Sequence, residues 1–259
     1  MSTATLLTEE WDEATVLVTL NRPDRRNALT IELMQSLCHT LETLAAEPQR
    51  RVLILTGAGS AFCAGLDLIE AADLSVAEHS AEWVARTLKT LWNSPLVTIA
   101  AVDGAAFAGG AGLLACCDLV VASDVVRIGF PEVRRGLVPA LVSVVLRQRL
   151  RDRDLRELLL LAEPIDALRA LDIGLVNRVV PQNQLNDEVR SLAATILKGA
   201  PEAVRQTKRL LREATENDFA QNFERALAIH RSARSSAEAR EGLAAFQERR
   251  EVDWSRPTT

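Results

Sequence analysis

The chain has 259 residues, of which 48% are hydrophobic and 25% charged, proportions typical of a soluble globular protein with a large core. Thirty Lys and Arg against 35 Asp and Glu give a formal net charge of −5, so the overall basic field of a nucleic-acid-binding protein is absent. The sequence has no apolar run near the roughly 20 residues that span a bilayer, and no secretion-signal pattern. We therefore expect a cytoplasmic protein that binds neither nucleic acid nor membrane.

Few side chains offer the usual catalytic or metal-binding chemistry. The four cysteines form no C-x-x-C motif, and the three histidines are not clustered, which predicts neither a disulfide framework nor a metal site. The chain has no Tyr, and no histidine lies in a nucleophile elbow. If the protein is an enzyme, we expect backbone groups and carboxylates to do the chemistry.

The first half of the chain alternates short apolar runs with stretches of helical spacing. The runs predict strands at Thr15–Leu20, Val52–Thr56, Leu96–Val102, Leu119–Ala122 and Arg127–Gly129. The helical spacing predicts helices at Thr30–Glu47, with Thr30 as the N-cap, and at Ser75–Leu91 and Gly109–Cys117. Repeated strand–strand–helix units of this kind indicate an α/β domain wound from similar turns.

The second half is dominated by helices rich in Arg and Leu. They are predicted at Leu141–Leu150, Asp154–Leu161, Ile165–Leu171, Gln184–Lys198, Pro201–Thr215, Asp218–His230 and Ala237–Arg249, with a short extended segment at Val176–Val180. We predict an α/β core over residues 1–190 and a helical region over residues 191–259 packed against it. The Arg-dense segment 147–156 contains interleaved acids, which favours a solvated, salt-bridged face over a nucleic-acid site.

Two glycine-containing segments, 57–67 and 101–112, each follow a predicted buried strand. Neither is a phosphate-binding P-loop or a dinucleotide fingerprint. Taken singly, each is best interpreted as a tight turn. Taken together, they indicate two helix entries whose unpaired backbone N–H groups could converge on one point. Such a pair forms an oxyanion hole, which suits a thioester carbonyl that must become an enolate.

Motifs along nearly the whole chain resemble those of the crotonase superfamily, the enoyl-CoA hydratase/isomerase proteins. They are Asn21–Pro23, Arg26–Leu29, Ala61–Asp67, Ala101–Gly104, Ala108–Gly110, Cys117–Asp118, Gly129–Glu132, Gly136–Pro139, Gly174–Asn177 and Glu241–Arg250. The resemblance implies a crotonase α/β fold, a spiral core of repeated ββα units with a helical C-terminal trimerisation region. Residues 108–113 and 132–140 look like the methylglutaconyl-CoA hydratase-like subgroup.

The resemblance also implies roles for single residues. The backbone N–H groups of Leu66 and Gly109 match the oxyanion-hole donors of the family. Positions that match its CoA and substrate contacts are Ala28, Ala64, Asp67, Leu68, Phe246 and Arg249. At Asp67, capping of the next helix is the stronger interpretation. Phe246 and Arg249 would reach CoA from a neighbouring subunit, and Arg249 stands where the family usually has Lys.

The acid–base residues depart from the pattern of the family's hydratases, which hold one water between two glutamates. Glu132 matches the second glutamate, whereas the position of the first is Gly112. A lone Glu132 facing the thioester α-carbon suits a Δ3-Δ2-enoyl-CoA isomerase. Members of the methylglutaconyl-CoA hydratase-like subgroup, however, often have Gly at this position. A salt bridge from Glu132 to Arg134 or Arg135 is the structural alternative.

We expect an enoyl-CoA hydratase, a lyase with Glu132 as the acid/base, and an isomerase is the first alternative. The second is a non-catalytic RNA-binding or assembly module on the same fold, which the acidic composition disfavours. The resemblance implies an acyl-CoA thioester as substrate, no cofactor besides the CoA of the substrate, and a homotrimer or dimer of trimers. Straight, branched and carboxylated acyl groups all stay open.

Overall fold

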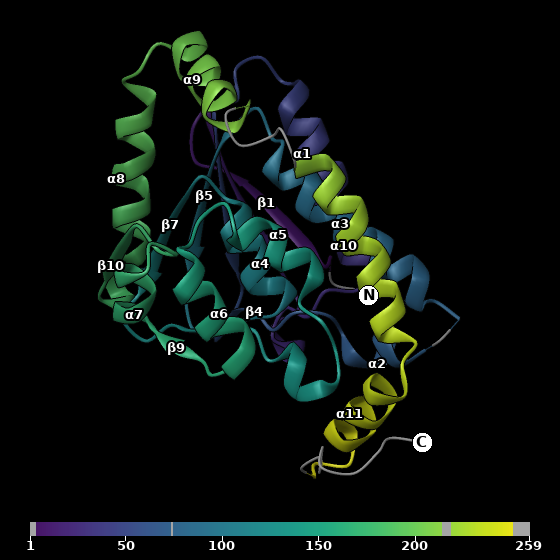
Figure 1. Cartoon of the computed structure of the whole chain (residues 1–259). Helices are drawn as coiled ribbons and strands as arrows, with labels where there is room; N and C mark the ends of the chain where they lie inside the picture. The colour runs from purple at the N-terminus through teal and green to yellow at the C-terminus, as the bar shows by residue number, and fades with distance from the viewer. Residues whose placement is uncertain (1–3, 74, 214–218, 251–259) are drawn as a thin grey trace.

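The computed structural model describes residues 4–73, 75–213 and 219–250, and Figure 1 shows a central sheet enclosed by helices. Six strands form this sheet in the order β1-β2-β3-β5-β7-β10. Their bounds are Leu6–Glu10, Thr15–Leu20, Val52–Gly57, Val97–Val102, Leu119–Ser123 and Arg178–Val180. β1 and β2 pair antiparallel, and every other neighbouring pair is parallel.

A smaller second sheet lies at the carboxyl ends of the central strands. Its order is β4 (Ala61–Cys63), β6 (Ala105–Phe107), β8 (Arg127–Gly129) and β9 (Ile165–Asp166). β4, β6 and β8 directly follow β3, β5 and β7, so the chain enters the second sheet after each of these central strands. This repeated passage, followed by helices, confirms the predicted α/β spiral of ββα units.

Eleven helices occur in the described part of the chain. They are α1 (Ile31–Ala46), α2 (Leu68–Ala72), α3 (Ala77–Trp92), α4 (Gly109–Cys116), α5 (Ala140–Leu146), α6 (Asp152–Leu161), α7 (Ala167–Asp172), α8 (Leu185–Leu197), α9 (Pro201–Glu213), α10 (Phe219–Arg234) and α11 (Ala237–Gln247). α10 packs against α3 and α5, and α11 continues past α2 at the lower end in Figure 1. None of the described helices is both long and apolar enough to cross a membrane.

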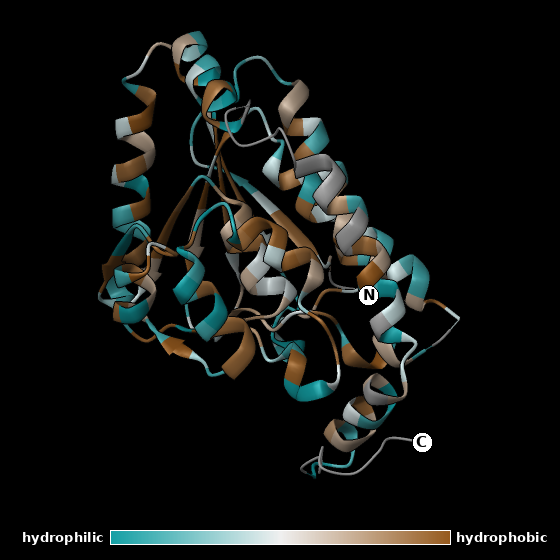
Figure 2. Cartoon of the chain, in the orientation of Figure 1, coloured by the Kyte–Doolittle hydropathy of each residue, from teal (hydrophilic) through white to brown (hydrophobic). Residues whose placement is uncertain are grey.

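Both faces of the central sheet are covered, which is why its inner strands consist of apolar residues. Val52–Leu55 of β3 are fully buried, and Figure 2 shows the central strands as strongly hydrophobic. Helices α1, α3, α4 and α5 pack on one face, whereas an apolar stripe of α8 that includes Leu185, Val189 and Leu192 covers the other. The Thr30 side chain accepts a hydrogen bond from the backbone N–H of Leu33, as expected for the N-cap of α1.

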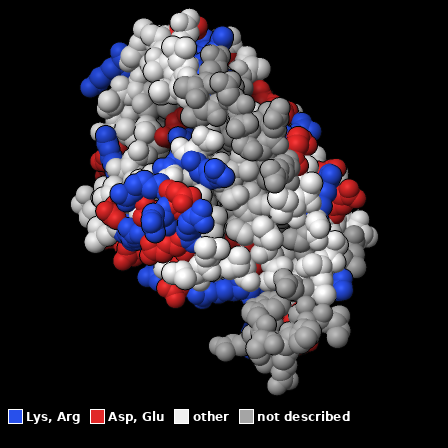
Figure 3. Space-filling view, viewed as in Figure 1, with Lys and Arg blue, Asp and Glu red and all other residues white. Residues whose placement is uncertain are grey.

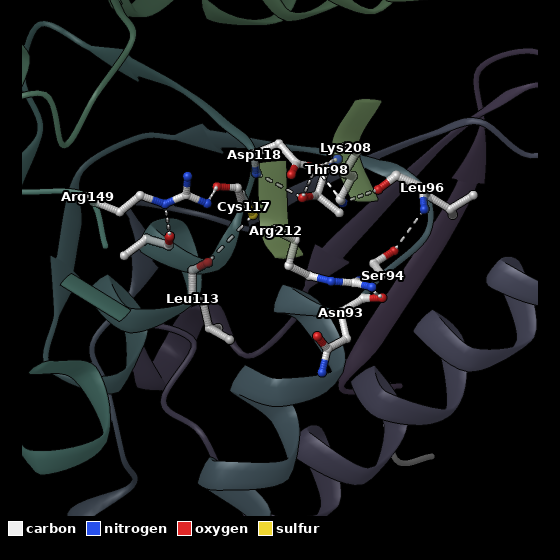
Figure 4. A network of polar contacts seen from close by, with 11 residues as sticks. Asn93, Ser94, Leu96, Thr98, Leu113, Cys117, Asp118, Arg149, Lys208 and Arg212 are labelled. Atoms are coloured by element: carbon white, nitrogen blue, oxygen red, sulfur yellow. Dashed lines mark hydrogen bonds and ion pairs between the residues drawn. The ribbon is translucent and has the colours of Figure 1, made fainter. Parts of the chain in front are cut away.

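A partly buried ion pair fixes α9 to the end of the sheet (Figure 4). The Lys208 ammonium donates to Asp118 and to the carbonyl of Leu96, both at 2.6 Å. Asp118 also accepts from the backbone N–H of Thr98 at 2.7 Å. Burial lowers the pKa of Lys208, while Asp118 favours its charged form. These two hydrogen bonds hold α9 in place.

The Arg-dense segment forms the salt-bridged face that its sequence predicts. Arg151 pairs with Asp154 at 2.7 Å, and Arg156 pairs with Asp152 at 2.7 Å. Arg169 of α7 reaches Asp154 as well, at 3.0 Å. Figure 3 shows acidic and basic side chains intermixed on this face of the molecule. Their opposite charges compensate one another, which confirms the prediction of a solvated surface.

Two of the predicted elements were wrong in extent. The predicted helix Ile165–Leu171 begins as strand β9, because Ile165 pairs with β8 and the Asp166 side chain caps α7. The predicted helix at Leu141–Leu150 already ends at Leu146. The ends of two predicted helices, at Thr215 and Asp218, fall outside the described residues. Residue 190 lies within α8, and the division into two regions there stays a prediction.

Candidate active site

The N-terminus of α4 supplies one free backbone donor. Gly109 is the first residue of the helix, so its amide has no intrahelical partner, and it donates to no other group in the described residues. Ala108 precedes it with φ 48° and ψ −122°, a strained conformation for a residue with a Cβ. The Ala108 N–H donates to the carbonyl of Gly129 at 2.9 Å, which holds this turn in place.

The turn after β4 supplies the second donor, at Leu66. Leu29 pins this turn from both sides: its N–H donates to the Gly65 carbonyl at 2.8 Å, and its carbonyl accepts from Asp67 at 2.9 Å. The N–H of Leu66 itself makes no hydrogen bond within the described ranges. A Cβ built on Gly65 would lie 3.5 Å from the Gly109 nitrogen, so the two turns are in contact. Two unpaired amides therefore lie on adjacent backbones.

These turns form one wall of a narrow cavity of about 60 Å³. Of the residues predicted at the site, five line it: Ala64, Leu66, Leu68, Gly109 and Glu132. The opposite wall comes from the segment 137–142 and from helices α10 and α11. Because the cavity is narrow, any acyl group inside it would contact both walls.

Glu132 is the one carboxylate lining this cavity among the described residues, and it begins the 3-10 turn Glu132–Arg135. Its Oε2 atom is buried and has no hydrogen-bond partner. Burial raises the pKa of Glu132 to about 7, against smaller opposing effects of a hydrogen bond from its own backbone N–H and of the Arg135 charge. A carboxyl group with this pKa can both take and return a proton near neutral pH.

The structural alternative for Glu132, a salt bridge to Arg134 or Arg135, is wrong. Arg134 turns away and donates to the carbonyl of Leu161 at 2.8 Å. The Arg135 guanidinium lies 4.8 Å from the ring centre of Phe246. Neither forms an ion pair with Glu132 in the part of the chain that the structure describes, so the carboxyl group stays available to a ligand.

Gly112 occupies the position where the resemblance leads one to expect a first glutamate. A Cβ built there would lie 2.8 Å from Val142 Cγ1 and 3.3 Å from Leu88 Cδ2, both on buried side chains. Apolar packing thus fills the place that a larger side chain would need. Two other glutamates, Glu70 on α2 and Glu82 on α3, do not line the cavity.

Arg22, to which the sequence analysis assigned no role, holds both Asp67 and Ala28 in place. Asp67 caps α2 by accepting from the N–H of Ile69 at 3.1 Å, as its structural interpretation predicts. It also pairs with Arg22 at 3.0 Å, and Arg22 donates to the carbonyl of Ala28. Neither Ala28 nor Asp67 lines the cavity, so contacts of these two residues with CoA stay a prediction.

The predicted C-terminal contacts lie near the rim of the same cavity. α11 packs closely on the 132–135 turn, since a Cβ built on Gly242 would lie 2.2 Å from the carbonyl oxygen of Arg135. Phe246 on this helix is 44% exposed, and Arg249 just beyond it has φ 55° and is exposed. Their predicted reach to the CoA of a neighbouring subunit stays a prediction.

Sequence reasoning missed three basic residues that line the cavity, Arg135, His230 and Arg234. Arg135 was considered only as an ion-pair partner of Glu132. His230 and Arg234 are four residues apart, which places them on one face of α10. That spacing was visible in the sequence, but nothing indicated that this face turns inward.

A larger cavity of about 480 Å³ lies between α9 and the amino ends of strands β5 and β7. Its lining includes Asp118, Lys208 and Arg149. Lys208 and Asp118 bind each other, and Arg149 donates to the carbonyls of Ala115 and Cys117. These groups serve packing, and the unpaired groups described above line the smaller cavity, which we take as the candidate active site.

The chain is similar to known proteins over almost its whole length. Residues 10–257 match the family model described as enoyl-CoA hydratase/isomerase. A Thermus thermophilus protein named for enoyl-CoA hydratase activity is 38% identical over 90% of this chain and 94% of its own length. An enoyl-CoA isomerase/hydratase of Mycosarcoma maydis is 32% identical over 89% of each chain.

Solved structures agree in fold. The crystal structure of an enoyl-CoA hydratase from Mycobacterium avium superposes with a TM-score of 0.87 at 32% identity, covering 98% of this chain and all of that one. Sequence similarity and backbone superposition therefore extend over the same residues. The chain belongs to the enoyl-CoA hydratase/isomerase family.

Proposed function

We propose that the protein is an enoyl-CoA hydratase that adds water reversibly to the double bond of an α,β-unsaturated acyl-CoA. One observation carries the proposal: the Glu132 carboxyl, whose buried Oε2 atom has no partner, lines the same narrow cavity as the two free amides of Leu66 and Gly109. A thioester carbonyl at the amides would place its acyl chain along the cavity wall that contains Glu132. The CoA enters as part of the substrate, and the reaction needs no separate cofactor.

In the proposed reaction, the Glu132 carboxylate takes a proton from water while the water oxygen bonds to C3 of the enoyl group. The π electrons move toward the thioester, and the resulting enolate oxygen accepts hydrogen bonds from the N–H groups of Leu66 and Gly109. Protonated Glu132 then gives its proton to C2. The pKa of about 7 supports both steps, because the group is neither a very weak base nor a very weak acid.

The test follows the absorbance of the unsaturated thioester in crotonyl-CoA. We expect the absorbance to fall with the parent protein and to stay constant with Glu132→Gln, which keeps the shape of the side chain but cannot accept the proton. Thermal unfolding and CoA binding of the variant serve as folding controls. Equal rates for the two proteins would remove Glu132 from the mechanism.

The packing at Gly112 favours a second candidate, a Δ3-Δ2-enoyl-CoA isomerase. With Val142 and Leu88 against Gly112, the cavity has one carboxyl group, and isomerisation needs only one group to remove a proton from C2 and return it to C4. A 3-enoyl-CoA offered beside crotonyl-CoA separates the two reactions. Appearance of the unsaturated thioester from the 3-enoyl substrate, without loss from crotonyl-CoA, would favour the isomerase.

We also propose that the protein works as a trimer or a dimer of trimers. Three leucines of α6 and α7, Leu160, Leu161 and Leu168, are more than half exposed, which is unusual for a monomer surface. In such an assembly Phe246 and Arg249 would approach the CoA of a neighbouring site, beside Ala28, Ala64, Asp67 and Leu68. Light scattering of the purified protein tests the assembly, and a fully active monomer would contradict it.

A further inference from the structure

The segment 26–29 runs beside the turn that contains the Leu66 amide. Leu29 and Leu66 form an isolated parallel bridge. In such a bridge one residue bonds to both neighbours of the residue opposite it, here to Gly65 and Asp67, and the opposite residue turns its own N–H to the other side. The position of Leu29 therefore sets the direction of the Leu66 N–H.

This segment has a strained start that a buried side chain holds in place. Arg26 and Asn27 have φ values of 50° and 55°, which residues with a Cβ adopt at a cost. The Asn27 side chain is fully buried and donates to the carbonyls of Ala58 at 2.9 Å and Ala61 at 2.7 Å. Asn27 thus fixes the start of the segment to the chain between β3 and β4, inside the core.

Arg22 holds the other end of the segment, next to the bridge. Its Nη1 donates to the carbonyl of Ala28, and its Nη2 donates to Oδ2 of Asp67 at 3.0 Å. Ala28 directly precedes Leu29, and Asp67 directly follows Leu66. One guanidinium therefore ties the two chains together beside the bridge that directs the amide. Because the guanidinium is a rigid planar fork, it also fixes the distance between its two acceptors.

The Arg22 side chain lies behind the turn and away from the space for a ligand. Neither Arg22 nor Asp67 lines the cavity, although both side chains are mostly buried, at 19% and 12% exposure. The second carboxylate oxygen of Asp67 accepts from the N–H of Ile69 at 3.1 Å and so caps α2. A substrate in the cavity would meet the Leu66 N–H and not the guanidinium, so any effect of Arg22 on the reaction must pass through the backbone.

We propose that Arg22 is a positioning residue of the oxyanion hole: through Ala28 and Asp67 it holds the Leu66 N–H in the direction that stabilises the enolate oxygen. An oxyanion donor is effective because its geometry is set before the reaction, and a displacement of about 1 Å can cost about 100-fold in rate. This inference rests on the proposed function, because it takes the thioester oxygen to lie at Leu66 and Gly109.

The first test observes the hydrogen bonds of the hole directly and needs no turnover. Butyryl-CoA labelled with carbon-13 at the thioester carbonyl is saturated, so it binds without being hydrated. Hydrogen bonds to its carbonyl oxygen lower the C=O stretching frequency, which difference infrared spectroscopy measures on the saturated complex. We expect a smaller lowering with Arg22→Met than with the parent, because Met has a similar length but cannot donate. Equal frequencies in the two complexes would overturn the proposal.

Two further variants show whether the effect belongs to the Arg22 contacts. Arg25→Met is the matched control, since Arg25 is an exposed residue of the same short turn, and its complex should have the frequency of the parent. An equal change in both Met variants would show a diffuse charge effect and contradict the proposal. Arg22→Lys keeps the charge and the ability to donate but loses the planar fork, so its frequency should lie between those of the parent and Arg22→Met.

Kinetics with crotonyl-CoA distinguish positioning from binding. Arg22→Met should lower kcat by about 10- to 100-fold and leave KM nearly unchanged, because the Leu66 hydrogen bond strengthens mainly in the transition state. Asp67→Asn should also lower kcat, and the double variant should lose less than the product of the two single losses, as expected for residues in one contact. A higher KM with unchanged kcat would assign Arg22 to substrate binding and overturn the proposal.

The two readouts separate this proposal from the proposed function. If the parent does not hydrate crotonyl-CoA but the carbonyl frequencies of the parent and Arg22→Met complexes still differ, the hydration fails and the role of Arg22 stands. If Arg22→Met does not fold, Asp67→Asn breaks the same contact from the other side. Its single amide oxygen can accept from Ile69 or from Arg22 but not from both, and a carbonyl frequency equal to that of the parent would then overturn the proposal.

Discussion

The two walls of the cavity are built in different ways. One wall consists of the turn at Gly65 and Leu66 and the first turn of α4, where backbone amides face the ligand space. The other includes the 132–135 turn and α10, where side chains that ionise or donate face the same space. The first wall is fixed by strands of the second sheet and contains no titratable group.

The difference shows how each wall obtains its chemistry. Backbone amides are positioned by main-chain hydrogen bonds and by glycines that allow close contact, so their direction depends little on side-chain identity. Glu132, His230 and Arg234 instead depend on burial, which changes their protonation or leaves them without partners. We therefore expect substitutions on the two walls to have different effects on turnover, ligand binding and stability.

The largest effect should come from Glu132→Gln. Loss of the proton-transfer group should lower kcat for crotonyl-CoA by about 100- to 10,000-fold, the usual contribution of general acid–base catalysis. Binding of a saturated acyl-CoA should change little, because the amides of Leu66 and Gly109 are untouched. A variant that fails to bind acyl-CoA would show that the two walls are not independent.

Removal of the Leu66 N–H is the corresponding test of the backbone wall. Replacing the amide at residue 66 by an ester, or the residue by Pro, should lower kcat by roughly 100- to 1000-fold, the usual effect of losing one oxyanion donor. Leu66→Ala is the matched control, since it shortens the side chain but keeps the N–H. Steady-state kinetics of the three proteins decide it, and normal turnover by the Pro variant would place the donor elsewhere.

Two neighbouring glycines on the backbone wall should differ in how much stability is lost when each is replaced by Ala. A Cβ on Gly110 would lie 2.3 Å from the carbonyl oxygen of Cys63, whereas one on Gly109 would lie 3.4 Å from a Leu29 methyl group. Gly110→Ala should reduce the free energy of unfolding by about 1–3 kcal/mol, as overpacking does. Gly109→Ala should reduce it much less. Denaturant unfolding of both variants measures the difference, and equal losses would contradict it.

The pH dependence of stability should reveal the buried carboxyl oxygen of Glu132. Its pKa is about 7 in the folded protein against 4.5 in the unfolded chain, so the folded state binds more protons between these values. The group therefore stabilises the fold below pH 4.5, and this stabilisation is lost as the pH rises through 7, at no more than about 1.4 kcal/mol per pH unit. Comparison of unfolding curves for the parent and Glu132→Gln should show this slope only in the parent.

Much of the fold could be predicted because its signals are local. The apolar runs of β2, β3 and β5 and the cap at Thr30 each occupy a few consecutive residues. Strands β4 and β6 were missed because each lies inside a glycine-containing segment that was interpreted as a tight turn, whereas β8, which is equally short, was predicted. The helical start predicted at Ile165 was wrong because pairing with β8, a contact between distant segments, overrides local preference.

The candidate site likewise combines residues that local motifs identify with residues that only the folded chain brings together. The glycine turns and Glu132 could be selected from motifs, but the roles assigned to them stay predictions. The burial of Glu132 Oε2 and the packing of Val142 against Gly112 depend on elements that meet only in the folded chain. His230 and Arg234 gave no usable signal, since the spacing of two basic residues on a helix does not show which neighbour that helix covers.

The presence of one carboxyl group in the cavity has a stereochemical consequence. If Glu132 both activates the water and supplies the proton, oxygen and hydrogen must reach the double bond from the side on which this carboxyl group lies. We therefore expect syn addition. Hydration in deuterium oxide should give a single diastereomer, with deuterium at C2 and the new hydroxyl at C3 added to the same face. A mixture of diastereomers would require a second proton donor.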